Sequence, residues 1–290
     1  MSKASVRTLV LVVAAALAAA AGTAAITLAA SPPGPAAAGP AAGATGGAAA
    51  PGRVGQKTIT YSRVVELSQP ITQKIPLWPG DPKVVFKVVA TMKKDGYYLR
   101  KFTIGEHSAT HMNAANSFIG GDTTAITDYP AAQRVVPAVV IDARTECAAN
   151  ADYRLTKQDV LDWEAAHGLI QPGTFVIMLT GWEDKWGSPK GFINLDAKGN
   201  LHFPGFAGAT SAWLLSDRQV AGVGIDTHGV DPGLDTSYAT NTAMAQAHKL
   251  VLECMGHLDE LPATGATLVL APLQLKGGSG SPLSVVALVP

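Results

Sequence analysis

The chain has 290 residues, with 22 Lys and Arg against 22 Asp and Glu, seven His and two Cys. Its hydrophobic content of 47% is enough for a sizeable core. The balanced charge gives no basic surface for nucleic acid, and two cysteines exclude a disulfide-rich scaffold and a four-cysteine zinc module. Cys147 and Cys254 form either one disulfide or two buried free thiols.

The first 57 residues differ in composition from the rest of the chain. Residues 1–7 carry two positive charges, and residues 8–52 carry no charge. Residues 1–30 are typical of a secretory signal peptide, and their apolar run is also long enough for an uncleaved N-terminal membrane anchor. Residues 31–57 are rich in Pro, Gly and Ala and predict a linker. We therefore expect an exported protein, secreted or held in the cell envelope.

Residues 58–290 have the composition of one soluble domain. Apolar and β-branched runs predict strands at residues 58–68, 83–92, 97–104, 137–144, 173–182 and 220–227, with two more inside 267–290. Capping residues and apolar spacing predict helices at residues 156–168, 209–216 and 241–252. Strands outnumber helices without regular alternation, which predicts a single α/β domain with a largely β core.

The segment most informative about chemistry is 105–118, GEHSATHMNAANSF, which places His107 and His111 four residues apart. In an extended strand the two imidazoles share a face but lie about 13 Å apart, too far for one ion. A bend within the small residues 108–110 brings them together. The pattern then indicates two metal ligands or, alternatively, a hydrogen-bonded His pair in a loop.

This segment resembles the signature of the cyclase family of metal-dependent hydrolases, His-x-Gly-Thr-His-x-Asp-x-Pro-x-His-Phe. The residues that match are His107, Thr110, His111 and Phe118. Further similar motifs follow in the family's order at residues 77–82, 202–205, 224–233, 252–262 and 279–282. The resemblance therefore covers residues 62–288, which is essentially the whole domain.

Several positions depart from the family pattern. Asn113 stands at the position of a metal-binding Asp, and Ser117 at that of the catalytic His. When the chains are aligned on Glu253, the family's later His ligand falls at Asn241 and not at His248. Ala also replaces the Gly and the Pro of the signature, at positions 109 and 115.

The resemblance implies a divalent metal site, with zinc or manganese as the ion. Its five positions are held here by His107, His111, Glu253, Asn113 and Asn241. Two imidazoles and one carboxylate form a recognised catalytic set that leaves a position for water, whereas amide oxygens bind more weakly. We therefore expect one tightly held ion rather than two.

The proton transfers of the reaction need a group other than position 117, because Ser117 replaces the family's His. His228, in the sequence GIDTHGVDPG, is the first candidate for this catalytic role. His202, Glu106 and Asp226 are the other candidates. A structural alternative for His228 is a hydrogen bond to a neighbouring turn.

The resemblance implies a swivelling β/β/α-type single domain at residues 58–290 that assembles as a homodimer or homotetramer. The expected activity is arylformamidase-like, as in tryptophan catabolism: metal-activated water attacks an amide, formamide or lactone carbonyl of a small-molecule substrate. The alternative is a secreted, non-catalytic binding protein on a degenerate cyclase fold. We expect no nucleic-acid partner, and membrane contact only through an uncleaved N-terminal anchor.

Overall fold

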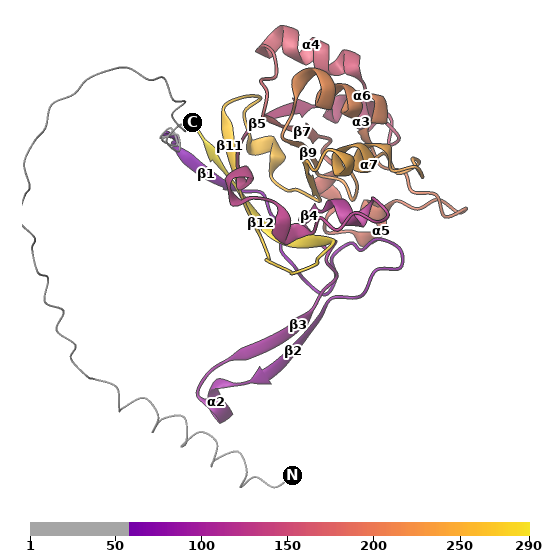
Figure 1. Cartoon of the computed structure of the whole chain (residues 1–290). Helices are drawn as coiled ribbons and strands as arrows, with labels where there is room; N and C mark the ends of the chain where they lie inside the picture. The colour runs from indigo at the N-terminus through magenta and orange to yellow at the C-terminus, as the bar shows by residue number, and fades with distance from the viewer. Residues whose placement is uncertain (1–57) are drawn as a thin grey trace, which may run out of the picture. The chain divides into compact units, whose positions relative to one another are not determined.

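Seven strands close into a barrel-like sheet in the computed structural model of the chain, which describes residues 58–290 (Figure 1). In spatial order they are β12 (Gly280–Val289), β11 (Ala266–Pro272), β5 (Val135–Asp142), β7 (Phe175–Leu179), β9 (Gly222–Ile225), β10 (Leu250–Glu253) and β4 (His111–Asn113). The sheet closes because β12 pairs with β4 at its start and with β11 along its length. β1 (Arg63–Glu66) adds an eighth strand beside the end of β12. The predicted signal, anchor and linker lie outside the described residues.

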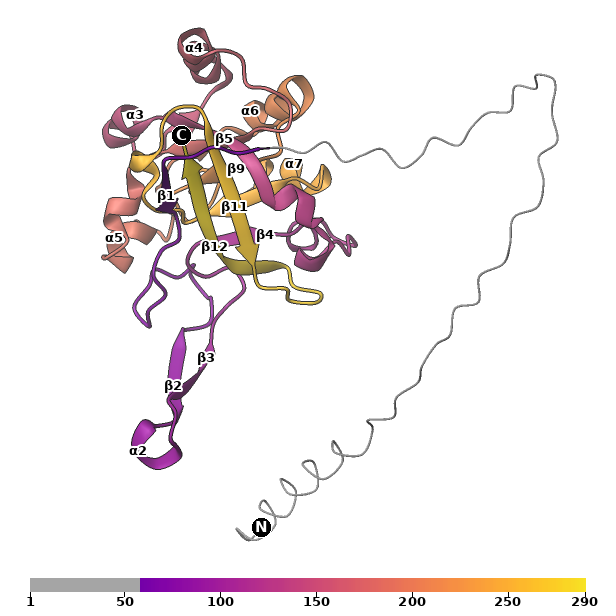
Figure 2. The ribbon, with the colours of Figure 1, turned by 90° about the vertical axis from the view of Figure 1, so that its left-hand side faces the viewer.

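The pairs β5–β7, β7–β9 and β9–β10 are parallel. The remaining pairs of the barrel are antiparallel. Parallel strands need long crossover connections, which here contain helices. The helices are α3 (Arg144–Ala149), α4 (Lys157–His167), α5 (Pro189–Ile193), α6 (Gly208–Trp213) and α7 (Ala239–Gln246). In Figure 1, α4, α6 and α7 lie on the side of the parallel strands and away from β11 and β12. In Figure 2, turned by 90°, β11 and β12 face the viewer.

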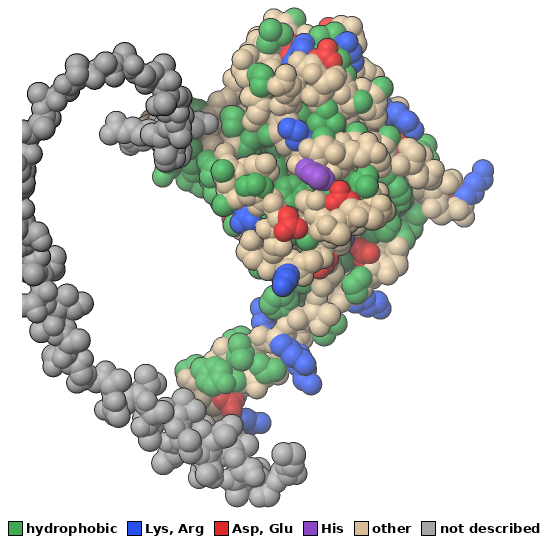
Figure 3. Space-filling view, viewed as in Figure 1, with side chains coloured by type: hydrophobic (Ala, Val, Ile, Leu, Met, Phe, Trp, Pro, Cys, Tyr) green, Lys and Arg blue, Asp and Glu red, His purple; other side chains and the backbone are tan. Residues whose placement is uncertain are grey.

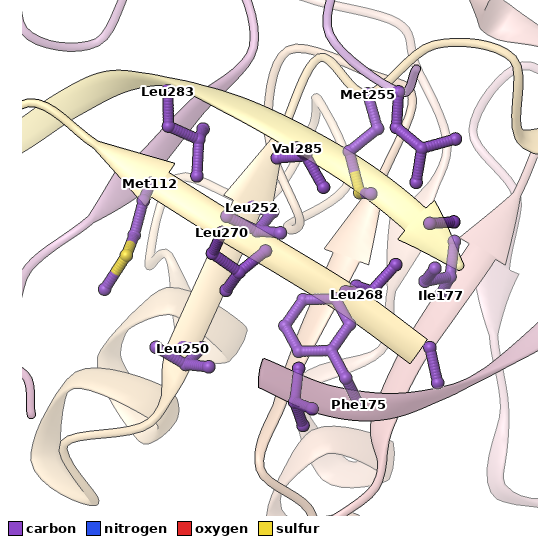
Figure 4. Close-up of a cluster of buried hydrophobic side chains, with 14 of the residues drawn as sticks. Met112, Phe175, Ile177, Leu250, Leu252, Met255, Leu268, Leu270, Leu283 and Val285 are labelled. Atoms are coloured by element: carbon purple, nitrogen blue, oxygen red, sulfur yellow. The ribbon is translucent and has the colours of Figure 1, made fainter. Parts of the chain in front are cut away.

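The sheet is buried on both faces, which explains its continuous apolar runs. Inside the barrel, side chains such as Phe175, Leu252 and Leu268 pack together (Figure 4). On the outer face, alternate residues of the same strands pack against α4, α6 and α7. Replacing a fully buried side chain such as Phe175 by Ala is expected to cost about 3–5 kcal/mol.

Shorter elements complete the domain. A hairpin of β2 (Val85–Ala90) and β3 (Leu99–Thr103) carries α2 (Met92–Asp95) at its tip, and β6 (Arg154–Leu155) pairs with β8 (Gly205–Phe206). The 3₁₀ turns are η1 (Ala115–Ser117), η2 (Ile126–Asp128), η3 (Ala131–Arg134), η4 (Trp182–Lys185) and η6 (Leu258–Glu260), and η5 (Leu214–Arg218) is a π turn. No helix in the described part of the chain is long and apolar enough to cross a membrane.

The predicted class, a mixed α/β domain with a largely β core, is confirmed. The helix predicted at 241–252 is wrong in its second half, because α7 ends at Gln246 and β10 begins at Leu250. Between them His248 adopts a left-handed conformation with φ 48°, which ends the helix and turns the chain into the sheet. Cys147 and Cys254 are two buried free thiols, the second of the predicted alternatives.

Candidate active site

A cavity of about 360 Å³ lies where β4, β10 and the start of α7 meet. This volume is typical of a small-molecule site. Four of the five candidate metal positions line it, namely His107, His111, Asn241 and Glu253. Trp78, Phe118, Leu201 and Phe203 supply apolar wall. The fifth position, Asn113, is buried directly behind.

The register of two strands brings His111 and Glu253 together. They are directly opposite residues of the antiparallel pair β4–β10, so their side chains leave the sheet on the same face. Asn113, two residues after His111, shares that face because side chains alternate along a strand. Met112 between them packs into the barrel core instead. In the sequence His-Met-Asn, the first and third side chains therefore belong to the site, and the second belongs to the barrel core.

The predicted bend between His107 and His111 is present. Ala109 takes a left-handed conformation with φ 56° and is fully buried. The turn places the two imidazole rings 5.3 Å apart between centroids, far closer than a strand allows. Gly280 on β12 faces the His107 ring, and a Cβ there would lie 2.6 Å from ring atom Cε1. This glycine is therefore required by the position of His107.

Hydrogen bonding fixes which nitrogen of His111 faces the site. Its Nδ1 lies 2.9 Å from the carbonyl oxygen of Ala109, so Nδ1 carries the donated proton. Its Nε2 lies 3.0 Å from Oε2 of Glu253, and both side chains are buried. Two atoms that carry lone pairs repel at this distance unless a proton or a cation lies between them. Metal-ligating histidines are held on a backbone carbonyl in the same manner.

The two asparagines connect the remaining site residues through hydrogen bonds. His107 Nδ1 donates to Asn113 Oδ1 at 2.9 Å, and Asn113 Nδ2 donates to Asn241 Oδ1 at 3.0 Å. Asn241 Nδ2 donates to Glu253 Oε1 at 3.1 Å and to Asp231 Oδ2 at 3.0 Å. The two asparagine side chains therefore join His107 to Glu253 and Asp231 in one continuous set of hydrogen bonds.

Two donor atoms, Nε2 of His111 and Oε2 of Glu253, have the spacing of two ligands of one divalent cation. Ligand atoms about 2.1 Å from one ion lie about 3.0–3.4 Å apart, which the His111–Glu253 separation matches. Within residues 58–290, no group of three or more His, Cys, Asp or Glu side chains is arranged to hold a metal. Both nitrogens of His107 are engaged, Nδ1 by Asn113 and Nε2 by Ser279 at 3.1 Å. His107 becomes a third ligand only when one of these bonds opens.

Burial and hydrogen bonding set the charges of the site. Burial acts to raise the pKa of Glu253, but the hydrogen bond and charge of His111 outweigh it and hold the pKa at about 2. Burial, reinforced by the charge of His111, lowers the pKa of His228 to about 4. Burial raises the pKa of Asp231 to about 6, against hydrogen bonds from the start of α7. At neutral pH the site therefore contains an ionised Glu253 and a neutral His228.

His228 is positioned to meet a ligand. It follows β9, and its ring lies 6.4 Å from the His111 ring and 5.5 Å from the Trp78 ring between centroids. The ring lines the cavity, and its Nε2 is buried without a hydrogen-bond partner. A buried polar atom normally has a hydrogen-bond partner, so Nε2 of His228 is available to a ligand in the cavity.

Ser117 also lines the cavity, at the end of η1. Its Oγ lies 3.4 Å from Nε2 of His107, a long contact. A hydroxyl does not titrate near neutral pH, so Ser117 cannot carry out the acid–base chemistry of an imidazole at this position. It can donate a hydrogen bond to His107 or to a ligand.

Three sequence candidates lie outside the cavity wall. His202 donates from Nδ1 to Asp152 at 3.0 Å and contacts Asp196, so its ring is held away from the cavity. Glu106 accepts two hydrogen bonds from Ser279, and fully buried Asp226 accepts from backbone and side chain at the end of β7. The prediction of these residues as proton carriers is therefore not supported by their positions.

The structure places His248, the ligand in the alternative register, outside the cavity wall. Its side chain is about half exposed, and Nε2 lies 2.9 Å from Oδ2 of Asp122. Asn241 instead lines the cavity beside Glu253. The alignment that places Asn241 and not His248 at the later ligand position therefore agrees with the fold.

Sequence reasoning missed two carboxylates of the site. Asp81 lines the cavity, and burial raises its pKa despite the nearby His107 and His111. Asp231 holds the start of α7 by accepting hydrogen bonds from the backbone N–H groups of Thr240 and Asn241. Asp81 lies in the family-like motif at 77–82, and Asp231 lies in the one at 224–233. Membership of these motifs could have indicated the two residues, but no spacing pattern links them to His107 and His111.

Comparisons with known proteins agree with this geometry. The family model described as "Putative cyclase" matches residues 65–232. The isatin hydrolase of Roseibium aggregatum is 34% identical over 218 residues, which cover 72% of this chain and 82% of that protein. A kynurenine formamidase of Bacillus cytotoxicus is 25% identical over 226 residues, covering 78% of this chain and 97% of that one. The chain belongs to the cyclase family.

A solved structure gives the same result for the fold. Isatin hydrolase A from Ralstonia solanacearum superposes with a TM-score of 0.74 at 32% sequence identity. The match covers 79% of this chain and 92% of that one. The described domain therefore has the fold of a cyclase-family hydrolase.

Proposed function

We propose that this protein is a hydrolase that uses one divalent metal ion and water to open an amide, formamide or lactone carbonyl of a small molecule. The observation that carries the proposal is the buried His111–Glu253 pair, whose Nε2 and Oε2 point at one another on the cavity wall. The similarity of the chain to an isatin hydrolase and to kynurenine formamidases supports compounds with a hydrolysable carbon–nitrogen bond as the first substrate class to test.

In this proposal His111 and Glu253 hold the ion, and His107 joins them as the third protein ligand. Two imidazole nitrogens and one carboxylate form a ligand set that suits zinc and manganese. Such an ion, when bound, polarises a carbonyl and lowers the pKa of a bound water. The negative charge of Glu253, maintained at neutral pH by its low pKa, is the main electrostatic attraction for the cation.

The remaining side chains act directly on the substrate. His228 is neutral at pH 7, so its buried Nε2 can accept a proton from water or a hydrogen bond from a substrate N–H. Trp78 and Phe203, whose rings lie 6.2 Å apart in an edge-on arrangement, give the cavity an apolar side suited to a flat ring. A small aromatic amide, cyclic amide or formamide fits this combination.

A second candidate function is non-catalytic binding of the same kind of small molecule. It is favoured by the amide chain Asn113–Asn241, which satisfies the buried polar groups without a second ion, and by Ser117 at the position of the family's catalytic His. In that case the cavity binds its ligand through His228 and the aromatic wall without turnover.

Steady-state assays distinguish the two candidates. The purified chain is freed of metal by chelation, reloaded with zinc or manganese, and assayed with isatin, N-formylkynurenine and a simple aryl lactone. Turnover of at least one substrate that chelation removes and metal restores supports the hydrolase. Tight binding of the same compounds by calorimetry with no turnover under any metal supports the binding protein.

We also propose that the protein works outside the cytoplasmic membrane. The support is the uncharged apolar run of residues 8–30 behind a short basic start, which is typical of an export signal. N-terminal sequencing of secreted or envelope-associated protein tests this. A mature start near residue 31 agrees with a cleaved signal, a full-length chain in the membrane agrees with an anchor, and full-length cytoplasmic protein contradicts export.

A further inference from the structure

The wall of the active-site cavity has acidic side chains and no basic ones. Among the described residues that line it, the carboxylates are Asp81, Asp231, Asp235 and Glu253. No Lys or Arg side chain of the described chain lines the cavity. Burial lowers the pKa of His107 and of His228, so these two imidazoles do not supply the missing positive charge at neutral pH. One divalent ion would balance only two of the four carboxylates.

The body around the cavity is also acidic. The hairpin segment of residues 83–103 carries six Lys and Arg against one Asp, and Figure 3 shows Lys and Arg side chains along it. The other residues of 58–290 contain twelve Lys and Arg against twenty-one Asp and Glu. The summed field of this body attracts cations and repels anions. A cationic ligand is therefore favoured before it makes any contact with the cavity wall.

A tight turn places Asp81 on the cavity wall beside an aromatic side chain. The backbone N–H of Asp81 donates to the carbonyl oxygen of Trp78 at 3.0 Å. Pro79 and Gly80 occupy the middle positions, and Gly80 has φ 99°, as in a type II turn. Trp78 and Asp81 both line the cavity. The sequence Trp-Pro-Gly-Asp therefore brings a carboxylate and an aromatic ring close together on one part of the wall.

The Asp81 carboxylate has no partner among the described residues. It forms no hydrogen bond and no ion pair with them, although Lys83 is only two residues away. Burial raises the pKa of Asp81, and the charges of His107 and His111 offset this effect only in part. A positive group of a ligand beside Asp81 would compensate for the lost water.

The other three carboxylates of the cavity are already engaged. Asp231 accepts hydrogen bonds from the start of α7, and Asp235 accepts them from the backbone and hydroxyl groups of Ser237. Glu253 accepts from the backbone of Val230 and from Asn241. Of the four, Asp81 is therefore the carboxylate with its hydrogen-bonding capacity free for a ligand.

A second polar group of the same cavity is also free. His228 is 4% exposed, and its Nε2 has no hydrogen-bond partner. Its ring lies 5.5 Å from that of Trp78, which begins the turn to Asp81. A neutral imidazole nitrogen and a carboxylate can both accept from N–H groups, and an aromatic face attracts a cation. A primary ammonium group, with three N–H donors and a positive charge, suits this combination.

We propose that the turn of residues 78–81 is an ammonium subsite of the cavity, in which Asp81 pairs with a primary amine of the substrate. The acidic wall then rejects compounds that carry a carboxylate. This inference rests on the proposed function, because it names the substrate class of the same cavity: small aromatic amides or formamides with an amine and without a carboxylate. Selection of this kind uses attraction and repulsion together.

Calorimetry at pH 7 with three related compounds and the purified chain tests the proposal. All three are 2-aminophenyl ketones: kynuramine has a primary amine, kynurenine has the same amine with a carboxylate, and 2-aminopropiophenone has neither. The wild type is expected to bind kynuramine about tenfold or more tightly than either of the others. None of the compounds has a bond for the proposed hydrolysis, so their binding is measured without turnover.

Two variants of Asp81 test the residue itself. In Asp81→Asn, kynuramine and 2-aminopropiophenone are expected to bind within about threefold of each other, because the charge is lost at nearly constant volume. Asp81→Glu is expected to keep the preference for the amine. The control is Asp162→Asn, which makes the same charge change at an exposed position of α4 and is expected to behave as the wild type. Circular dichroism confirms the fold of each variant.

Three results overturn the proposal. One is the absence of kynuramine binding by the wild type, and another is equal or tighter binding of kynurenine or of 2-aminopropiophenone. The third is a preference for kynuramine that survives in Asp81→Asn. Hydrolysis of the N-formyl derivatives of kynuramine and kynurenine is measured separately. Turnover without the binding preference overturns the ammonium subsite and not the hydrolase, whereas the preference without turnover supports the subsite in a binding protein.

Discussion

Nε2 of His111 and Oε2 of Glu253 lie 3.0 Å apart, at directly opposite positions of β4 and β10. The strand register therefore fixes this pair, although the two residues are far apart in the sequence. The Ala109 carbonyl orients the imidazole, and the Glu253 carboxylate is ionised at neutral pH. Both features favour a cation between the two atoms.

We expect the metal stoichiometry to depend on Asn113. We expect one equivalent of zinc or manganese in the wild type and tighter binding, or a second equivalent, in Asn113→Asp, because a carboxylate replaces an amide beside His107. Without metal, the buried negative charge should lower stability by about 1–3 kcal/mol, and added metal should restore it. Elemental analysis after dialysis, with thermal melts, measures both effects. Two equivalents at full occupancy in the wild type would show that amide oxygens are adequate ligands.

Gly280 is expected to be necessary for the position of His107. In Gly280→Ala the new methyl group collides with the imidazole ring, so His107 must move. We expect at least tenfold weaker metal binding or activity with the domain still folded. Gly120→Ala is the control, because nothing lies within 4 Å of a Cβ at that position. Equal effects of the two variants would contradict this role.

The pH dependence of activity is expected to follow His228. We expect the residue to act through a neutral nitrogen. Because burial lowers its pKa to about 4, its contribution should be present above that value and disappear as the pH falls through it. We expect His228→Gln to lower kcat by about 10²–10⁴-fold and to alter the acidic limb of the pH–rate profile. His257→Gln, at a half-exposed histidine, is the control. A wild-type limb near pH 6.5 that persists in His228→Gln would exclude this residue as the base.

Glu183 makes stability depend on pH. Burial, with repulsion from Asp226, raises the pKa of Glu183 to about 7. Hydrogen bonds from the backbone N–H groups of His257 and Leu258 act in the opposite direction but are weaker. The folded state holds a proton that the unfolded chain releases above about pH 4.5. The stabilisation is therefore complete below that pH and is lost as the pH rises through 7.

Glu183→Gln removes this titration. Urea unfolding at pH 5 and pH 8 should show that the wild type loses about 1–2 kcal/mol more than the variant over this range. Asp184→Asn, at the exposed neighbour, should behave as the wild type does. Identical pH dependence in wild type and Glu183→Gln would contradict the assignment.

Much of the fold could be predicted from local patterns. The strands at 137–144, 173–182 and 220–227 are apolar on both faces, and the structure buries them between barrel core and helices. β4 could not be predicted, because three residues are too few to show the alternation of apolar and polar side chains that indicates a strand. The pattern at 241–252 predicts a helix that includes β10, because a short apolar run suits either structure, and only the pairing with β4 and β9 decides between them.

The site was predictable where residue type alone indicated chemistry. His107 and His111 were identified from their spacing, and the small residues between them predicted the bend that Ala109 makes. The hydrogen bonds of Asn113 and Asn241, and the isolation of His202, depend on long-range packing. Spacing along the chain contains no such information, so the sequence could not rank the candidate proton carriers by position.

Titration of the metal-free chain with zinc or manganese by calorimetry, with circular dichroism to confirm folding, tests the central claim most directly. The account predicts one site in the wild type, no measurable binding in His111→Ala, and binding weakened at least tenfold in Glu253→Gln. It also predicts wild-type affinity in His248→Ala, because that side chain is half exposed and contacts Asp122. Loss of the metal in His248→Ala, with wild-type binding in Glu253→Gln, would contradict the proposed site.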